Sequence, residues 1–174
     1  IEINIYEESL AGGIEALLEK RTDIFLGIKP LVVNDDIETH FYKDIVWAFV
    51  VPKDHALCKL PQPLSQQHIA AYRSVIVRDS VRNSAAVNYR LFSKKPVLRV
   101  SSVREKILAQ KAGLGVGFLP LELIQEELIS GELVALTIAG VDNTTPIYLS
   151  HWQQVRGKAK DVLLSYLLAA NLER

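Results

Sequence analysis

Residues 101–120 constrain the fold more than any other stretch, because they encode a capped helix that leads directly into a buried strand. Ser102 is a typical helix N-cap, and Glu105 three residues later completes a capping box. Gly113 can adopt the left-handed conformation that ends a helix, and residues 116–119 then form an apolar strand. The apolar face of this helix is predicted to contain Ile107, Leu108 and Ala112.

The glycines of this stretch do not indicate a nucleotide-binding loop. The dinucleotide fingerprint follows a strand and opens a helix. Here the order is helix, then Gly113, Gly115 and Gly117, then strand. A helix C-cap followed by a tight turn explains these glycines better.

The rest of the chain alternates between strand-like and helix-like segments, which predicts an α/β fold. The opening strand–helix–strand order predicts a parallel unit, and the apolar run 23–28 predicts a strand covered on both faces. We expect residues 31–44 to form a loop with at most a short strand, and 53–64 a surface loop. Predicted strands are 1–5, 23–28, 45–51, 75–77, 97–100, 116–119, 133–138 and 147–152. Predicted helices are 9–18 with Ser9 as its N-cap, 65–72 with Ser65 as its N-cap, 84–92, 101–112, 121–128 and 157–170.

Composition narrows the classes of function. A chain of 174 residues with 49% hydrophobic residues can bury a core in one domain or two small lobes. The formal net charge of zero gives no electrostatic reason to bind nucleic acid. The single Cys58 excludes an internal disulfide and fits a reducing, cytoplasmic compartment, and no apolar run reaches membrane-spanning length. The absence of methionine predicts that a segment precedes Ile1.

No catalytic, cofactor or metal motif is evident, so we expect no enzyme, no cofactor and no metal. The four histidines, 40, 55, 68 and 151, have no His, Cys or carboxylate partner at the spacing of known metal motifs. Ser80 lacks the glycines of a nucleophile elbow.

What remains is a set of polar residues at predicted strand ends and helix starts, where ligands bind in open α/β sheets. Each could instead be only a helix cap or a solvated side chain, but together they predict a small-molecule site. Arg78 and Arg82 favour an anionic group on the ligand. The set consists of Ser9, Lys29, Arg78, Asp79, Ser80, Arg82, Ser101 and Ser102.

In order and spacing, several segments resemble the effector-binding domain of LysR-type transcriptional regulators over essentially the whole chain. They are Ile1–Ile3 with Glu7 before a helix, 23–28 (DIFLGI), 51–57 (VPKDHAL), 112–120 (AGLGVGFLP) and 131–134 (GELV).

The resemblance implies a type II periplasmic-binding-protein-like fold, in which two α/β lobes joined by two hinge crossings near residues 73 and 146 enclose a small effector in their cleft. Lobe I would comprise residues 1–72 and 147–174, and lobe II residues 73–146. The family's first strand and helix of this domain, and its N-terminal winged helix-turn-helix, would be missing from the chain.

Carried over by position, the resemblance implies ligand contacts from Ser9, Leu10, Arg78, Asp79, Ser80, Ser101, Ser102 and Phe118, and Lys29 is expected to join them from the polar set above. It also implies a homodimer, a tetramer of the full-length protein, and contact with DNA only through the missing domain. The alternatives are an extracytoplasmic solute-binding protein of the same fold and an enzyme on a related two-lobed fold.

Overall fold

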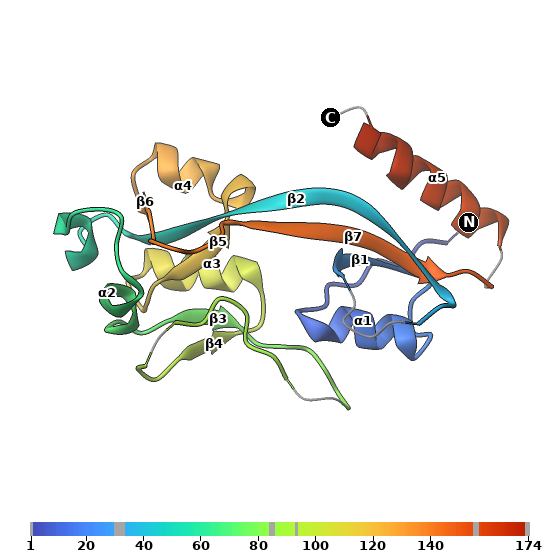
Figure 1. The fold of residues 1–174 in the computed structure, drawn as a ribbon, viewed down its shortest axis with the longest axis horizontal. Helices are drawn as coiled ribbons and strands as arrows, with labels where there is room; N and C mark the ends of the chain where they lie inside the picture. The colour runs from blue at the N-terminus through green and yellow to red at the C-terminus, as the bar shows by residue number, and fades with distance from the viewer. Residues whose placement is uncertain (1, 30–33, 84–85, 93, 155–156, 173–174) are drawn as a thin grey trace. The chain divides into compact units, whose positions relative to one another are not determined.

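The structure, a computed structural model, describes residues 2–29, 34–83, 86–92, 94–154 and 157–172. The chain forms two compact units (Figure 1). Unit 1 comprises residues 1–44, 79–87 and 145–174, and unit 2 comprises residues 45–78 and 88–144. These units differ from the predicted lobes mainly in residues 45–72, which group with 88–144 rather than with the N-terminal segment.

Unit 1 holds the first helix, two strands, half of a long strand and the last helix. Helix α1 packs against strand β1. No helix among the described residues is long and apolar enough to cross a bilayer. The elements are α1 (Ala11–Leu18), β1 (Ile24–Ile28), the first half of β2 (Ile37–Pro52), β7 (Thr144–Trp152) and α5 (Lys158–Leu172).

Unit 2 contains the remaining elements, and its helix α3 packs against strands β3, β4 and β5. After the second half of β2 come η1 (Ala56–Lys59), α2 (Gln66–Ala70), β3 (Val75–Val77), β4 (Leu98–Val100) and α3 (Val103–Lys111). The chain continues through β5 (Gly117–Pro120), η2 (Leu121–Leu123), α4 (Gln125–Ile129) and β6 (Leu133–Leu136).

Two sheets organise these strands. The larger has the order β1-β7-β2-β5, with β6 also paired to β2, and β1–β7, β2–β5 and β2–β6 are antiparallel. The smaller sheet is the parallel pair β3–β4, which aligns Val77 with Val100. Parallel pairing brings the carboxyl ends of β3 and β4 to the same edge.

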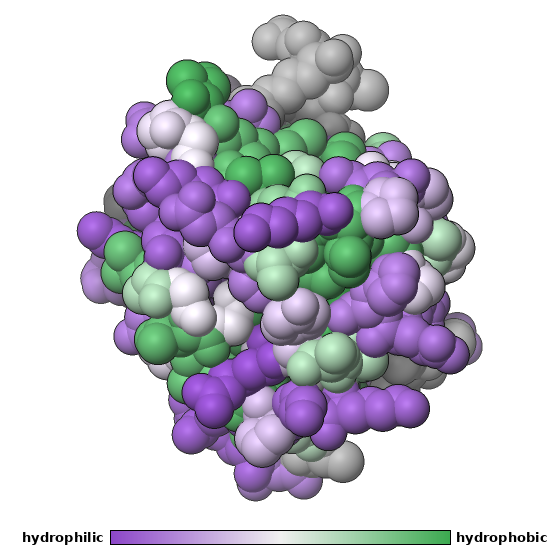
Figure 2. All heavy atoms as spheres, turned by 90° about the vertical axis from the view of Figure 1, so that its left-hand side faces the viewer, coloured by the Kyte–Doolittle hydropathy of each residue, from purple (hydrophilic) through white to green (hydrophobic). Residues whose placement is uncertain are grey.

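The core of unit 2 is apolar and dense. Phe118 is 1% exposed and meets the ring of Phe49 edge-on at 5.2 Å between centroids. Val51, Leu57 and Leu64 have no exposed surface. Hydrophobic and hydrophilic side chains are mixed over the molecular face shown in Figure 2.

The predicted opening strand and parallel unit are wrong for the described residues. Residues 2–9 form no strand, and Ile3 and Ile5 are 58% and 90% exposed; Ile1 lies outside the described residues. Alternating isoleucines make a strand only when a neighbouring strand supplies hydrogen bonds, and none does so here. The next strand, β1, pairs antiparallel with β7, and Leu26 is 47% exposed, so that strand is not covered on both faces.

Two further expectations fail. Strand β2 begins at Ile37, inside the predicted loop 31–44, of which residues 31–33 lie outside the described part. The predicted helix 84–92 is absent over residues 86–92, and residues 84–85 lie outside the described part. Both segments take their backbone conformation from distant contacts rather than from local propensity.

Segments with strong local signals are confirmed. Strand β3 and helix α3 lie where the sequence predicts them, and Gly113 has φ 72° just past α3. Ser65 caps α2 through a capping box completed by His68. The predicted surface loop 53–64 additionally contains η1.

Candidate functional site

The start of α3 fixes two predicted ligand residues in unit 2. Ser102 is the N-cap, and its Oγ accepts a hydrogen bond from Glu105 N at 3.2 Å. The Glu105 carboxylate does not return to Ser102, as the predicted capping box requires. It accepts from both N and Oγ of Ser101, at 2.8 Å each. The hydrogen bond from the Ser101 backbone N–H lowers the pKa of the Glu105 carboxyl, and the hydrogen bond from the Ser101 hydroxyl lowers it further.

The sheet edge brings a third predicted residue to the same place. Arg78 directly follows β3, Ser101 directly follows β4, and Arg78 N donates to Val100 O at 2.8 Å. The Arg78 side chain is exposed. Two strand ends and a helix N-terminus thus meet at one edge, with Arg78 and the two serines next to each other in the backbone and the Glu105 carboxylate bound by Ser101. A helix N-terminus of this kind favours a negatively charged group.

The inner face of α3 holds two polar residues that the sequence analysis missed. Lys106 is 8% exposed, and Gln110 has no exposed surface. Neither Gln110 Nε2 nor Oε1 has a hydrogen-bond partner among the described residues. Burial lowers the pKa of Lys106 to about 8. The signal available in the sequence was their four-residue spacing, which places both on one helix face.

Gly117 makes room for these two side chains. A Cβ there would lie 3.0 Å from Val75 O, 3.1 Å from Gln110 Nε2 and 3.6 Å from Lys106 Cε. The predicted apolar face of α3 is partly wrong, because Leu108 is 58% exposed. A lysine and a glutamine occupy positions where an apolar face would be cheaper to bury, which marks them as functional candidates.

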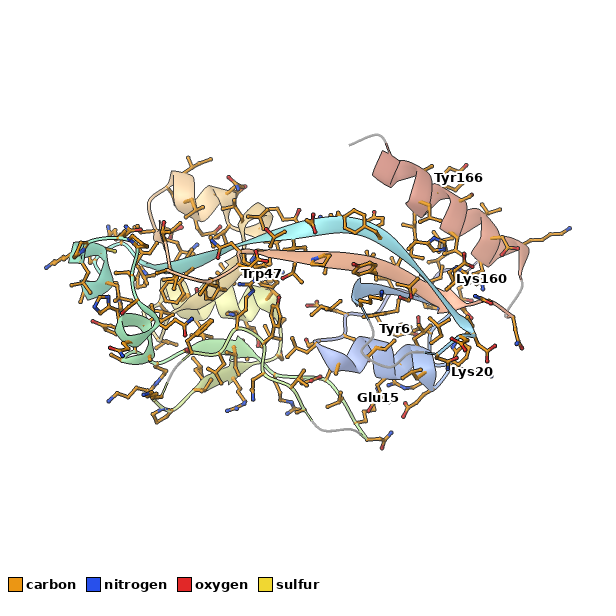
Figure 3. All side chains as sticks on the ribbon, viewed as in Figure 1. Tyr6, Glu15, Lys20, Trp47, Lys160 and Tyr166 are labelled. Carbon is orange, nitrogen blue, oxygen red and sulfur yellow. The ribbon has the colours of Figure 1, made fainter. Side chains whose placement is uncertain are left out.

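Phe118, the remaining predicted residue of unit 2, lies in the core. The Arg90 guanidinium lies 5.2 Å from its ring centroid, and Arg90 Nη1 donates to Asp142 O at 2.6 Å. The same guanidinium lies 5.5 Å from the ring of Trp47, which Figure 3 labels.

In unit 1, Ser9, Asp79 and Ser80 lie close together. The side-chain oxygens of Asp79 and Ser80 accept hydrogen bonds from the backbone. Ser9 N donates to Ser80 Oγ at 2.8 Å, and Ser80 N donates to Ser9 O at 3.3 Å. Asp79 is 6% exposed, and its carboxylate accepts from the backbone N of Gly12 at 3.2 Å, of Val81 at 3.2 Å and of Val87 at 2.8 Å.

The cap of α1 corrects another expectation. The N-cap is Leu10, with φ 54° and no side-chain cap bond, and not Ser9. A Cβ on Gly12 would collide with Ser80 Oγ, so this glycine permits close packing rather than loosening the helix. The Nζ of Lys29 lies 5.8 Å from the centroid of the Tyr148 ring.

Surface hollows and metal donors lie elsewhere. In unit 2, one hollow is lined by Gln66, Gln67, Ala70, Ala71, Phe92, Lys94 and Lys95, and another by Pro52, Lys53, Asp54, His55, Lys111, Gly113 and Glu132. Neither includes a predicted ligand residue. Among the described residues, Glu38, His40 and His151 form a group with donor types suited to a metal ion.

Comparison with known proteins agrees with this fold. The Escherichia coli K12 protein described as probable HTH-type transcriptional regulator YhaJ is 29% identical over 133 residues, covering 76% of this chain and 45% of its own length. The effector binding domain of QuiR in complex with shikimate superimposes with a TM-score of 0.67 and 16% identity, over 92% of this chain and 77% of that one. The regulatory domain of Synechocystis PCC6803 CcmR in complex with 2-PG gives a TM-score of 0.68 and 14% identity, over 91% and 77% of the two chains.

The chain therefore has the type II periplasmic-binding-protein-like fold. The family model of the LysR substrate binding domain matches residues 1–170, and the chain belongs to this family. It spans about half the length of the curated relatives it matches.

Proposed function

We propose that this chain binds a small anionic effector and that the whole protein uses this binding to control transcription. The carrying observation is the α3 start, where Arg78, Ser101 and Ser102 meet at the edge of the β3–β4 sheet in a domain of this family. Relatives described as transcriptional regulators support the assignment. The same relatives favour it over a solute-binding protein or an enzyme.

The charge of the effector is inferred from unit 2. A helix N-terminus and a guanidinium attract a carboxylate or phosphate, and Lys106 lies one turn further along α3. Side chains on a helix lean toward its N-terminus, so the Lys106 stem extends toward the turn that begins at Ser102. An anion bound there would raise the pKa of Lys106 and offset the cost of its burial.

The other predicted contacts take different roles in this proposal. Ser9, Leu10 and Lys29 are proposed contacts from unit 1, and Phe118 is a proposed apolar contact. Asp79 and Ser80 would act by holding the backbone, since their side-chain oxygens already accept backbone hydrogen bonds.

Three properties of the whole protein belong to the same proposal. We infer a homodimer for this domain, a tetramer and a cytoplasmic location for the full-length regulator, and DNA binding through a separate domain. Effector binding would change the DNA-bound state by its differential affinity for two conformations. Light scattering coupled to size exclusion tests the dimer, and a monomer at high protein concentration contradicts it.

Thermal unfolding against a panel of small carboxylates, phosphates and their neutral analogues tests effector binding. At a free concentration 100 times its Kd, a ligand stabilises the folded chain by about 2.7 kcal/mol. For a chain of this size, the melting temperature should then rise by about 5–10 °C. We expect at least one anion to produce this rise and its neutral analogue to fail.

Variants then locate the site. Arg78→Ala and Ser101→Ala should abolish the rise, while Arg99→Ala and Ser130→Ala, exposed residues of the same types in unit 2, should retain it. Undiminished binding in both Arg78→Ala and Ser101→Ala would refute the placement at α3.

A further inference from the structure

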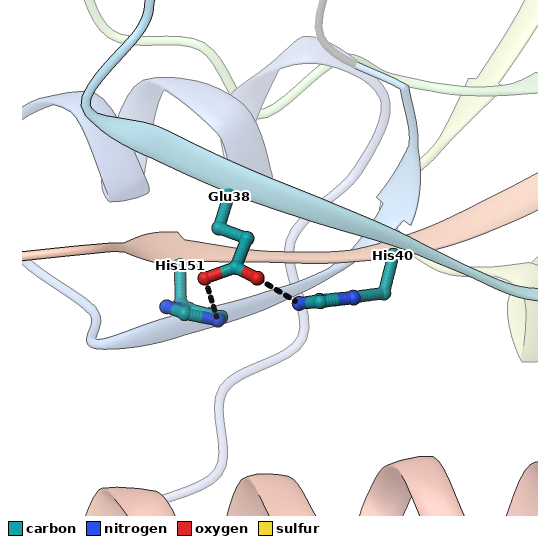
Figure 4. Close-up of side chains that lie close together, drawn as sticks. All are labelled: Glu38, His40 and His151. Atoms are coloured by element: carbon teal, nitrogen blue, oxygen red, sulfur yellow. Dashed lines mark ion pairs between the residues drawn. The ribbon is translucent and has the colours of Figure 1, made fainter.

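Three side chains of unit 1 bring one carboxylate and two imidazoles together (Figure 4). Glu38 and His40 are two residues apart on β2, so their side chains leave the same face of the strand. His151 lies on β7, the neighbour of β2 in the sheet. His40 Nε2 is 3.1 Å from Glu38 Oε1, and His151 Nε2 is 3.7 Å from Glu38 Oε2. The two rings stack with centroids 5.7 Å apart.

The hydrogen bonding of His151 leaves an electron pair directed at Glu38. His151 Nδ1 lies 3.2 Å from Trp152 O, and because a carbonyl oxygen only accepts, Nδ1 carries the hydrogen. Lys160, labelled in Figure 3, donates to the same carbonyl at 2.8 Å. A neutral His151 then has its lone pair on Nε2, which faces a carboxylate oxygen. A cation or a proton between these two electron-rich atoms would offset their repulsion.

We propose that Glu38, His40 and His151 bind a divalent transition-metal ion of the zinc class. Two imidazole nitrogens and a carboxylate are a known ligand set for zinc with an open fourth position. Zinc bonds of about 2.0–2.1 Å in tetrahedral geometry put neighbouring ligand atoms about 3.3 Å apart. In the structure the three ligand atoms lie within 4.8 Å of one another, and the two imidazole nitrogens face different oxygens of the Glu38 carboxylate, at 3.1 and 3.7 Å.

Burial of the three groups fits an ion that enters from solvent. The His151 side chain is 9% exposed, whereas those of His40 and Glu38 are 33% and 46% exposed. The buried imidazole is oriented by the Trp152 carbonyl, because metal-ligating histidines commonly donate their other ring N–H to a carbonyl or carboxylate oxygen. Water can complete the coordination on the exposed side.

The ion would join β2 to β7 within unit 1. Because its three ligands are not among the proposed effector contacts, the metal site can be tested separately from effector binding. A metal that binds the folded chain and not the unfolded chain raises the free energy of unfolding. The domain would then respond to a metal ion as well as to an effector.

Competition titration with a chromophoric zinc chelator tests the site on the purified chain. We expect one Zn²⁺ per chain, and Co²⁺ at the same site should give the visible absorption of tetrahedral coordination. His40→Gln and Glu38→Gln should each raise the dissociation constant by at least about tenfold, the lower end of what loss of a supporting contact costs. His68→Gln, which removes an exposed histidine from unit 2, should bind zinc as the wild type does.

Two results would overturn the proposal. One is zinc binding that is non-saturable or equal in His40→Gln and wild type. The other is an NMR titration in which the ring signals of His151 report protonation next to Glu38 and do not move when zinc is added. Because His151 is buried, its own variant is not used, and the circular dichroism of the two exposed-ligand variants in chelator checks that they are folded.

Discussion

Replacing Lys106 by methionine should stabilise the domain by removing a buried ammonium group. Methionine keeps the unbranched shape, so packing against Gly117 and Gln110 changes little. The folded pKa of Lys106 is about 8 against an ordinary value of 10.5. A difference of about 2.5 pKa units corresponds to about 3 kcal/mol at pH 7, because each unit is worth about 1.36 kcal/mol.

The pH dependence gives the sign of the effect. Between about pH 8 and 10.5 the unfolded chain holds the Lys106 proton and the folded chain does not, so raising the pH across this window stabilises the wild type. The advantage of Lys106→Met should therefore fall from about 3 kcal/mol at pH 7 to about 1 kcal/mol at pH 10.

Urea denaturation at pH 7, 8.5 and 10 measures this advantage. Arg104→Met, an exposed change of charge on the same helix, is the matched control and should show little change with pH. In thermal unfolding at pH 7, Lys106→Met should melt about 6–12 °C higher. An advantage that is absent at pH 7, or that stays constant up to pH 10, would refute the reasoning. If the variant is more stable but no longer binds the anion, the result indicates that Lys106 contributes to ligand binding at the expense of stability.

Three other substitutions test separate features by urea denaturation. Asp79→Ala removes a buried carboxylate that accepts three backbone N–H groups, and should cost about 3 kcal/mol; a loss below 1 kcal/mol would contradict its bracing role. Gly115→Ala places a Cβ 2.6 Å from the Arg73 carbonyl oxygen and should cost about 1–3 kcal/mol, and a neutral result would show that this backbone yields. Ser102→Ala removes the α3 cap and should cost about 1 kcal/mol, while Ser101→Ala should cost less; the reverse order would place the cap elsewhere.

Much of the fold around α3 could be predicted from the sequence, because helix caps and glycine turns are local. Ser102 and Glu105 lie within one helical turn, and Gly113 ends the helix by its own conformation. The resemblance, carried by short segments in order, is confirmed by the family match over residues 1–170. The sequence placed Arg78 and Ser101 at the ends of predicted strands, and the parallel pairing of β3 with β4 then brings those ends to one edge.

Strand pairing and burial depended on residues far apart in the chain. The isoleucines near the N-terminus alternate as in a strand, yet residues 2–9 pair with none of the described strands, while the segment from Ile37 begins β2. The histidine spacing in the sequence gave no metal motif, because His40 and His151 become neighbours only when β7 lies beside β2.

The sequence by itself determined the Ser102 cap and the Gly113 end of α3, the Ser65 cap of α2, and the family that the chain resembles. Only the tertiary structure decided that Lys106 and Gln110 face inward, and that Asp79 is a backbone brace. The physical reason is the sequence distance over which each interaction acts. A helix cap forms between atoms a few residues apart, whereas desolvation and strand hydrogen bonds depend on a segment that is distant in the sequence.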